Sequence, residues 1–318
     1  MINTKLRSPQ SWSKMEEVYK KQVSLLLSVL PEVAKEKCFA LHGGTAINLF
    51  VRNMPRLSVD IDLTYLPIED RNTSLKNIRE ALESIRGNIE KVIPDVKVNH
   101  RQESGKLHIS ANKVDIKLEV NLVNRGALAT PRTMELCEKA QDEFEVFCVM
   151  PVVTNGQLFG GKIIAALDRQ HPRDLFDVKY LQETEGFTEE IKEGFLHYLL
   201  CSDRPIHEII TPNFQDHRAT MENQFAGMTE ETFDYEEYEC IREKLVQTIH
   251  ANLTEDDKRF LLSVKRGTPD WTIYDFERFP AVRWKLQNLQ NLKEKNPDKH
   301  RELYNALESK LNKYYNKN

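Results

Sequence analysis

The stretch "CFALHGGTAINLFVRNMPRLSVDIDLTY", Cys38 to Tyr65, decides the fold of this 318-residue chain. "CFALH" is short and apolar and ends at a glycine pair, as expected for a buried strand. "TAINLFVRN" continues with the spacing of a helix. In "LSVDIDLTY" apolar and polar residues alternate, so Asp60 and Asp62 lie on one face of a second strand. The stretch therefore predicts a strand, a glycine turn, a helix and a strand that carries two carboxylates.

The sequence on either side of this stretch predicts further helices and a hairpin. Apolar residues at helical spacing predict a helix over residues 11–37 that Pro31 interrupts, and another over residues 74–93. The runs "KLHISA" and "VDIKLEVNLV" alternate as strands do and meet at "NK", which predicts a hairpin. In the second run Asp115, Lys117 and Glu119 share a face.

The strand pattern fades after "EVFCVMPVVT", and the remainder has mainly helical spacing, broken by Pro, Asn and Gly. We therefore predict a domain boundary near Val153. Residues 1–152 form a mixed α/β domain with a helical lead-in, and residues 153–318 form an α-helical domain.

Composition excludes several classes of protein. With 45 basic and 49 acidic residues the formal charge is −4, so no overall basic field holds nucleic acid or an anionic membrane, and any RNA contact must be local. The longest apolar run, "VSLLLSVL", is too short to span a membrane, and "MINTKLRSPQ" lacks the apolar core of a signal peptide. We expect a cytoplasmic protein without a membrane contact. Its five scattered cysteines form no Cys-x-x-Cys pair and are expected to be reduced.

The glycine turn and the two aspartates together suit metal-dependent phosphoryl or nucleotidyl transfer. Glycines let the backbone approach phosphate oxygens, and N–H groups at a helix start attract them. Carboxylates two residues apart on a strand can hold Mg²⁺. A third acid from a neighbouring strand usually completes such a site, and Glu119 is the candidate, with Asp115 in reserve. The alternative is that these acids are solvated strand residues, and the glycine pair favours the metal site.

These motifs also resemble a known family. "GGT" followed by "RLSVDIDL" resembles the signature of the DNA polymerase β-like nucleotidyltransferases. More specifically, "HGGTAINLF", "IKLEVNLVNRG" and "FGGKIIAALDRQHPRDLFDVKYL" resemble the AbiEii/AbiGii toxins of bacterial toxin–antitoxin and phage-defence systems, which are related to the MenT toxins. The likeness runs from about Phe39 to Asn291. The family's turn often reads Gly-Ser, whereas this chain has Thr45 after its two glycines and so keeps a hydroxyl.

The resemblance implies an α+β fold, in which a polymerase β-like nucleotidyltransferase domain with a mixed sheet is followed by an α-helical domain that closes over the nucleotide. It implies that Asp60 and Asp62 bind Mg²⁺, with Mn²⁺ as an alternative ion, and that Lys162 reaches the triphosphate. The phosphate-binding turn would be Gly43, Gly44 and Thr45. Because Lys162 follows "FGG", we also expect it to open a helix; the alternative is a solvated lysine.

The motif "DRQHPRDLFDV" predicts that Pro172 separates two helices. Asp174 and Asp177 then lie at i and i+3 on the first turn of the second helix. We place Asp174 in the site, where it would orient Lys162 or Arg169, and assign Asp177 to helix capping and a salt bridge. Arg173 would meet substrate phosphate, and Arg169 is also expected to bind the nucleotide.

These observations lead to one main hypothesis and two alternatives. The main hypothesis is a Mg²⁺-dependent toxin that transfers NMP from an NTP to the 3′ end of tRNA and blocks translation, with a cognate protein antitoxin. We expect the RNA on the helical domain, near Arg169, Arg173 and the Lys-rich tail of residues 285–318. The alternatives are a nucleotidyltransferase that modifies a protein hydroxyl or a small molecule, and a non-catalytic nucleotide-binding regulator.

Overall fold

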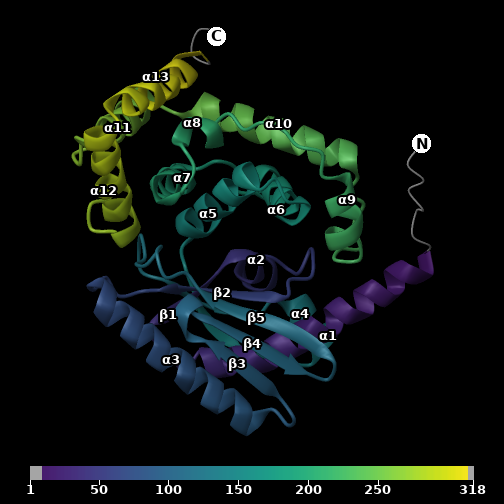
Figure 1. Ribbon diagram of the computed structural model, residues 1–318. Helices are drawn as coiled ribbons and strands as arrows, with labels where there is room; N and C mark the ends of the chain where they lie inside the picture. Colours follow the sequence, from purple (N-terminus) through teal and green to yellow (C-terminus); the bar gives the residue numbers. More distant parts are fainter. Residues whose placement is uncertain (1–8, 314–318) are drawn as a thin grey trace. The chain divides into compact units, whose positions relative to one another are not determined.

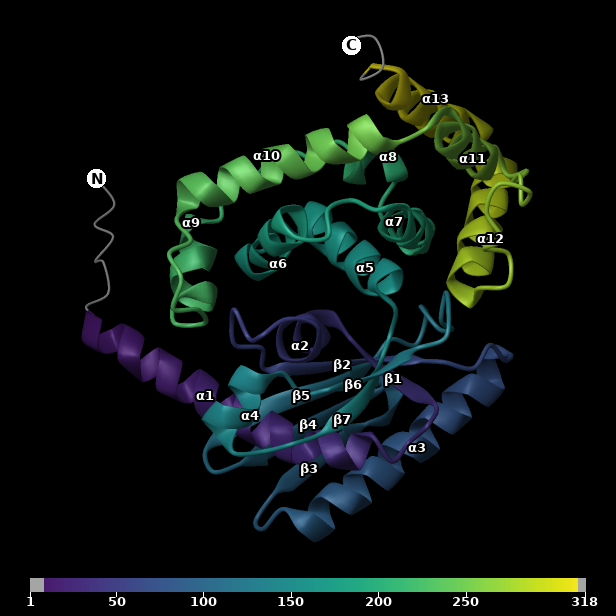
Figure 2. The same cartoon turned by 180° about the vertical axis from the view of Figure 1, so that it is seen from behind.

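The computed structural model describes residues 9–313, which form two compact units (Figure 1, Figure 2). The first unit comprises the chain up to Leu122, together with Ala129–Val153 and Arg218–Phe233. The second comprises Val123–Leu128, Thr154–His217 and the chain from Asp234 onward. That residues 1–152 and 153–318 fold as separate domains stays a prediction.

The first unit is built on a mixed seven-stranded sheet with the strand order β3-β4-β5-β2-β1-β7-β6. Strand β2 runs parallel to β5, and β1 runs parallel to β7, while the other neighbours are antiparallel. The strands are β1 Phe39–His42, β2 Asp60–Tyr65, β3 Lys97–Arg101, β4 Lys106–Ala111, β5 Val114–Val120, β6 Arg132–Glu135 and β7 Val149–Val152.

Helices cover the apolar face of this sheet. In both views α1 and α3 lie on one side of it and α2 lies on the other (Figure 1, Figure 2). Leu26 and Leu30 of α1, Ile85 of α3 and the strand residues Ile61 and Leu118 are buried, because alternate strand residues point to the same covered face. The helical segments of this unit are α1 Pro9–Val33, α2 Gly43–Ala46 with a π-helical turn Ile47–Val51, α3 Arg71–Val92, α4 Glu138–Phe144, and α9 Arg218–Thr220 with a π-helical turn Met221–Phe225.

Local sequence explains where several of these elements begin and end. Pro31 does not interrupt α1 as predicted, because it lies within the last turn of a helix that ends at Val33. The predicted hairpin is confirmed: β4 and β5 pair directly, and Asn112 and Lys113 both have positive φ, as a type I′ turn requires. Strands β3 and β6 were not predicted, and they are the two edges of the sheet.

The second unit consists of helices. Its central feature is the close packing of α5 against α7, in which a Cβ on Gly194 would lie 1.8 Å from the Gly156 carbonyl oxygen and one on Gly160 would lie 2.3 Å from the Gly194 carbonyl carbon. The glycines therefore let two helix backbones touch. The helices are α5 Asn155–Asp168, α6 Pro172–Glu183, α7 Glu189–Cys201, α8 Ile206–Ile209, α10 Tyr235–Asn252, α11 Glu255–Arg266, α12 Pro280–Lys295 and α13 Pro297–Lys313.

The helical tail packs as a surface helix does. Leu307 and Leu311 of α13 are buried, and so is His300, whose Nε2 lies 2.9 Å from the Lys265 carbonyl oxygen. Among helices within residues 9–313, none is both long and apolar enough to cross a membrane.

Candidate functional site

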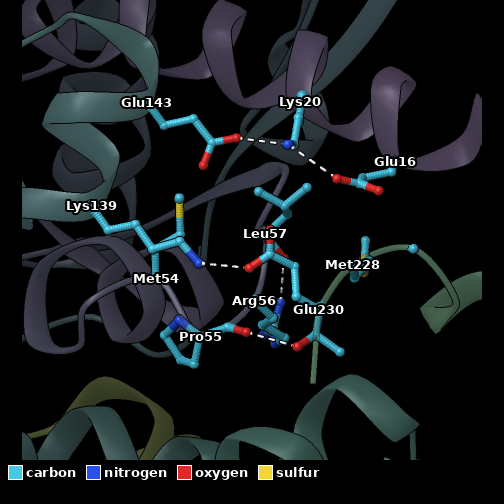
Figure 3. A pocket seen from close by; sticks show the side chains of 12 residues that line it. Glu16, Lys20, Met54, Pro55, Arg56, Leu57, Lys139, Glu143, Met228 and Glu230 are labelled. Atoms are coloured by element: carbon cyan, nitrogen blue, oxygen red, sulfur yellow. Dashed lines mark hydrogen bonds and ion pairs between the residues drawn. The ribbon is translucent and has the colours of Figure 1, made fainter. Parts of the chain in front are cut away.

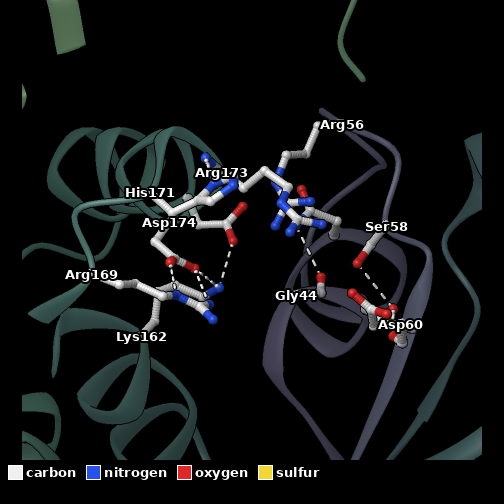
Figure 4. A network of polar contacts seen from close by, with 12 residues as sticks. Gly44, Arg56, Ser58, Asp60, Lys162, Arg169, His171, Arg173 and Asp174 are labelled. Carbon is white, nitrogen blue, oxygen red and sulfur yellow. Dashed lines mark hydrogen bonds and ion pairs between the residues drawn. The ribbon is translucent and has the colours of Figure 1, made fainter. Parts of the chain in front are cut away.

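The glycine turn lies directly against the second aspartate. Gly43 has φ +71°, in the left-handed region that favours glycine, and a Cβ at this position would lie 2.4 Å from Asp62 Oδ2. A Cβ on Gly44 would lie 2.9 Å from Arg56 Nη2 and 3.0 Å from Ser58 Oγ. Figure 4 shows Arg56 and Ser58 beside Gly44. Any side chain in this turn would therefore displace the polar groups around it.

Thr45 ties the turn to the carboxylate strand. Its side chain is fully buried, and its hydroxyl donates to the Asp60 carbonyl oxygen over 2.6 Å and lies 3.0 Å from Ser58 Oγ. His42, which ends β1, places Nδ1 3.1 Å from Thr64 Oγ1 on β2. The turn and the strand are thus held together by side chains on both sides of Asp62. The Thr45 hydroxyl serves this link, so its backbone N–H is the group suited to phosphate.

Asp60 and Asp62 lie half-exposed on one face of β2, as predicted. The parallel register places Lys117 beside Asp60 and Glu119 beside Asp62. These four side chains therefore share the polar face of the sheet, because registered neighbours point the same way. The neighbouring lysine was not predicted as part of the site, since strand register between distant segments cannot be read from alternation alone.

Glu119 is paired with two lysines. One carboxylate oxygen lies 3.0 Å from Lys106 Nζ and the other 2.8 Å from Lys117 Nζ. Burial raises the pKa of Glu119. The charges of Lys117 and Lys106 lower this pKa by more than burial raises it, so the pKa lies below the ordinary glutamate value. Burial lowers the pKa of Lys117, but Glu119, Asp60 and Asp62 more than offset this and the pKa lies above its ordinary value. The carboxylate is ionised and the lysine charged at neutral pH.

The structure does not show a preformed three-acid metal site. Among the described residues, no three His, Cys, Asp or Glu side chains are grouped as such a site needs. Asp115, the reserve carboxylate, lies at the other end of β5 and accepts a hydrogen bond from Ser110 Oγ. The role of Glu119 as a third metal ligand therefore stays a prediction.

The second unit holds a separate cluster of charges on α5 and α6. Lys162 Nζ lies 2.9 Å from Asp174 Oδ1 and 3.0 Å from Asp177 Oδ2, and all three side chains are at most 6% exposed. Arg169 donates to Asp174 through Nε over 2.5 Å and through Nη2 over 3.0 Å, while its own side chain is 63% exposed (Figure 4). We call Lys162, Arg169, Asp174 and Asp177 the buried ion cluster.

The helix starts explain this cluster. Helix α5 begins at Asn155, so Lys162 lies in its middle and not at its start as predicted; the glycines of "FGG" lie inside the helix. Pro172 opens α6 as predicted, and His171 caps it by accepting from the Arg173 N–H at Nδ1 over 3.1 Å. Asp174 and Asp177 then lie one turn apart and meet the same ammonium.

Electrostatics keep Asp174 ionised. Burial raises the pKa of Asp174, but Lys162 and Arg169 lower it by more, so it lies well below the ordinary aspartate value. The sequence predicts Asp174 in the site and Asp177 in a salt bridge, and in the structure both aspartates are buried partners of Lys162. Removing one member would leave an opposite charge buried without its partner.

A pocket in the first unit is too small for a nucleotide. It lies beside residues 54–57 and has a volume of about 20 Å³, room for about one water molecule (Figure 3). Met228 accepts from the Leu57 N–H over 2.7 Å, and the Thr229 hydroxyl donates to the Pro55 carbonyl oxygen over 2.9 Å. The segment 218–233 therefore fixes the chain that leads into β2.

The chain matches the family described as nucleotidyl transferase AbiEii toxin, type IV toxin–antitoxin system, over residues 24–288. The chain belongs to this family. It is therefore a nucleotidyltransferase, and a toxin of a type IV toxin–antitoxin system. Both the predicted family and the predicted enzyme class are confirmed. Among curated proteins, no sequence matches this chain.

A solved structure has a similar fold. MenT4, a nucleotidyltransferase toxin from Mycobacterium tuberculosis H37Rv, superposes with a TM-score of 0.57 at 13% sequence identity, over 87% of this chain and 98% of MenT4. The predicted fold class, an α+β protein with a mixed sheet followed by a mostly helical region, is confirmed.

Proposed function

We propose that this toxin transfers a nucleoside monophosphate from an NTP to the 3′-terminal hydroxyl of tRNA. The acceptor oxygen forms a bond to the α-phosphorus, the bond between the α-phosphorus and the bridging oxygen breaks, pyrophosphate leaves, and the hydroxyl proton is released. The observation that carries the proposal is the close approach of Asp62 to Gly43, where a Cβ would lie 2.4 Å from Asp62 Oδ2, so the carboxylate strand lies directly beside the glycine turn proposed to bind phosphate.

The residues of β2 fit a divalent cation, Mg²⁺ or Mn²⁺. Mg²⁺ is typically held by one or two carboxylates together with waters and substrate phosphates, and two half-exposed carboxylates on one strand face supply that donor set. The absence of a Cβ on Gly43 makes room for the Asp62 carboxylate itself, because a Cβ there would lie 2.4 Å from Asp62 Oδ2. When bound, the ion would neutralise the phosphates and activate the acceptor hydroxyl. Asp60 and Asp62 are its proposed ligands, and Glu119 is the predicted third.

The backbone of Gly43, Gly44 and Thr45 would bind phosphate oxygens, since helix-start N–H groups carry partial positive charge. For the second unit we retain the predicted roles. Lys162 would contact the triphosphate, and Asp174 would orient the Lys162 side chain. Arg169 and Arg173 would bind phosphate oxygens. The 2.9 Å contact between Lys162 and Asp174 supports the orienting role.

An RNA acceptor suits a toxin, because modifying the 3′ end of tRNA would block aminoacylation and stop translation. A protein hydroxyl or small molecule is the alternative acceptor, and a non-catalytic nucleotide-binding regulator is the alternative outside this chemistry. A cytoplasmic location and a cognate protein antitoxin complete the proposal.

The test incubates the pure protein with each α-³²P-labelled NTP, total tRNA and Mg²⁺, and separates RNA from protein afterwards. We expect label on tRNA from one or more NTPs, and none with Asp62→Asn. Label found on protein alone would overturn the RNA acceptor and support the alternative one. No transfer and no pyrophosphate release with any acceptor would overturn the proposed reaction.

A further inference from the structure

The polar face of the outer sheet is basic. Strands β3, β4 and β5 present Lys97, Arg101, Lys106, His108 and Lys117 on the face opposite to the one that α1 and α3 cover, and we call these five residues the basic face. Lys97 and Arg101 are exposed, and the others are half-buried. His100, by contrast, points to the covered face and lies 2.8 Å from Glu83 of α3.

The strand register places Arg101, Lys106, His108 and Lys117 in two rows, while Lys97 lies in a third row with Ser110 and Asp115. Arg101 pairs with Lys106, Lys106 with Glu119, and Glu119 with Asp62. In the second row Asn99 pairs with His108, His108 with Lys117, and Lys117 with Asp60. Both rows run from the exposed sheet edge to one of the two catalytic-site aspartates. Across three strand spacings of about 4.8 Å each, a row covers roughly 14 Å, which a polymer spans more readily than a small molecule.

Glu119 fixes the middle of these rows. It holds Lys106 and Lys117 through one oxygen each, and both lysine side chains stay about one-third exposed, at 32% and 36%. An anchored lysine with an exposed ammonium loses less side-chain freedom on binding an anion than a free one does. On β3, β4 and β5 this face carries two acidic residues, Glu119 and Asp115. The four positive charges of its lysines and arginine therefore outnumber the negative charges.

The chemistry of the face favours phosphates over an apolar partner. A row of Lys and Arg is the usual contact of a nucleic-acid backbone. A protein acceptor would need apolar anchor pockets, which the charged rows do not offer. Phosphate contacts position a strand without reading its sequence.

We infer that the basic face binds the backbone of the RNA acceptor and directs its 3′ end toward Asp60 and Asp62. The inference rests on the proposed function and names the surface that serves it. It differs from the sequence-based expectation, which placed RNA on the helical domain. There Lys285 donates to the Ser202 carbonyl oxygen over 2.6 Å, Lys299 pairs with Glu302 and Arg169 pairs with Asp174. Pairing with protein groups is thus common to both surfaces, and the basic face is favoured by its two rows that end at Asp60 and Asp62.

The experiment compares two double variants of the full chain. Lys97→Gln with Arg101→Gln removes two exposed cations from the basic face. Arg79→Gln with Lys91→Gln removes two exposed cations from α3, which covers the opposite face, and serves as the matched control. The probe is a fluorescein-labelled RNA hairpin with a single-stranded 3′ tail, and its binding is followed by anisotropy in EDTA at several salt concentrations, so that no transfer occurs.

We expect the β3 double variant to bind the hairpin about tenfold more weakly or worse, with the slope of log affinity against log salt reduced by roughly 1.5, because two phosphate contacts are lost. The α3 control should stay within about twofold of the unmodified protein, since a change in net charge alone has a small effect at moderate salt. Equal thermal unfolding of both variants excludes misfolding as the cause.

Three results would overturn the inference, and they separate it from the proposed function. If both double variants bind the RNA hairpin with equal affinity while the unmodified protein labels tRNA, the basic face is not the RNA-binding surface, and the proposed transfer to tRNA is unaffected. If the unmodified protein does not bind the hairpin and labels a protein, the RNA partner is wrong and nucleotidyl transfer stands. If no pyrophosphate is released with any acceptor, both fail.

Discussion

The acids of β2 and the buried ion cluster of α5 and α6 handle charge in opposite ways. Asp60 and Asp62 are half-exposed on the polar face of the sheet, beside Gly43 and Gly44, which have no side chains. Asp174 and Asp177 are 1–2% exposed, and both contact the ammonium of Lys162. Accessible carboxylates can bind a cation from solvent, whereas buried ones must be satisfied within the fold. Substitutions in the first region should therefore change activity alone, and those in the second should change activity and stability together.

The largest effect is expected at the first region. Asp60→Ala or Asp62→Ala should lower nucleotidyl transfer by at least about a thousandfold, because charge stabilisation by a bound metal is worth several kcal/mol. The midpoint of thermal unfolding should change little, since substitutions at exposed sites usually alter stability by about 0.5 kcal/mol or less. Transfer kinetics, growth arrest on expression and calorimetry measure this. Growth arrest by either variant, expressed at the level of the unmodified protein, would contradict the assignment.

The next effect concerns Lys162. Lys162→Ala should lower turnover by a factor on the order of a hundred or more, as for other preorganised charge contacts. It should also lower the free energy of unfolding by about 3–5 kcal/mol, because it leaves two buried carboxylates facing each other. Lys162→Arg should restore part of the rate.

Single-turnover transfer and urea unfolding measure the two effects separately, with the exposed Lys244→Ala of α10 as the control. Added Mg²⁺ should partly rescue Asp60→Ala and should not rescue Lys162→Ala. If Lys162→Ala has normal turnover at saturating substrate but unfolds at a lower urea concentration, Lys162 is a purely structural residue. That result would sharpen the contrast between the two regions.

A smaller effect follows from the pKa of Asp174. Because this pKa lies below its ordinary value in the folded protein, its stabilising contribution is present above the unfolded pKa, near 4, and is lost as the pH falls toward the folded pKa. Asp174→Asn should lower the free energy of unfolding by about 1.5–3 kcal/mol at neutral pH. The difference between the two proteins should narrow below about pH 4. A constant difference down to pH 2 would contradict this account.

The smallest expected effect separates the two roles of Glu119. If Glu119 positions Lys106 and Lys117, Glu119→Gln should weaken binding of the RNA hairpin a few-fold and leave the Mg²⁺ concentration for half-maximal transfer unchanged. Asp115→Asn should change neither. A large rise in the Mg²⁺ requirement of Glu119→Gln would instead confirm its predicted role as the third metal ligand.

The sequence was sufficient for the centre of the fold. The glycine pair, the alternation in "LSVDIDLTY" and the "NK" turn are local signals, and each sets the structure of the residues that carry it. The edge strands β3 and β6 are not predicted from the sequence because few of their side chains are buried. Val98 is the buried residue of β3, and β6 has none. Strands at an edge need less apolar sequence, so alternation is weak there.

The candidate site was predictable in part. Asp60 and Asp62 share a face because of local spacing, but the positions of Lys117 and Lys106 beside Glu119 depend on strand pairing over long sequence distances. The glycines before Lys162 indicate a helix start by sequence, whereas in the structure they lie inside α5, and Gly160 serves the contact of α5 with α7. Burial of Asp177 depends on the packing of α6 against α5, where it meets Lys162, and spacing alone does not reveal this packing.

Metal binding at β2 tests the central claim most directly. Mn²⁺ binding would be followed by electron paramagnetic resonance in the presence of a non-hydrolysable NTP analogue, for the unmodified protein, Asp62→Asn and Asp174→Asn. We predict that the unmodified protein and Asp174→Asn bind Mn²⁺ with similar affinity, while Asp62→Asn binds it far more weakly. Equal Mn²⁺ binding by Asp62→Asn and the unmodified protein would contradict the account.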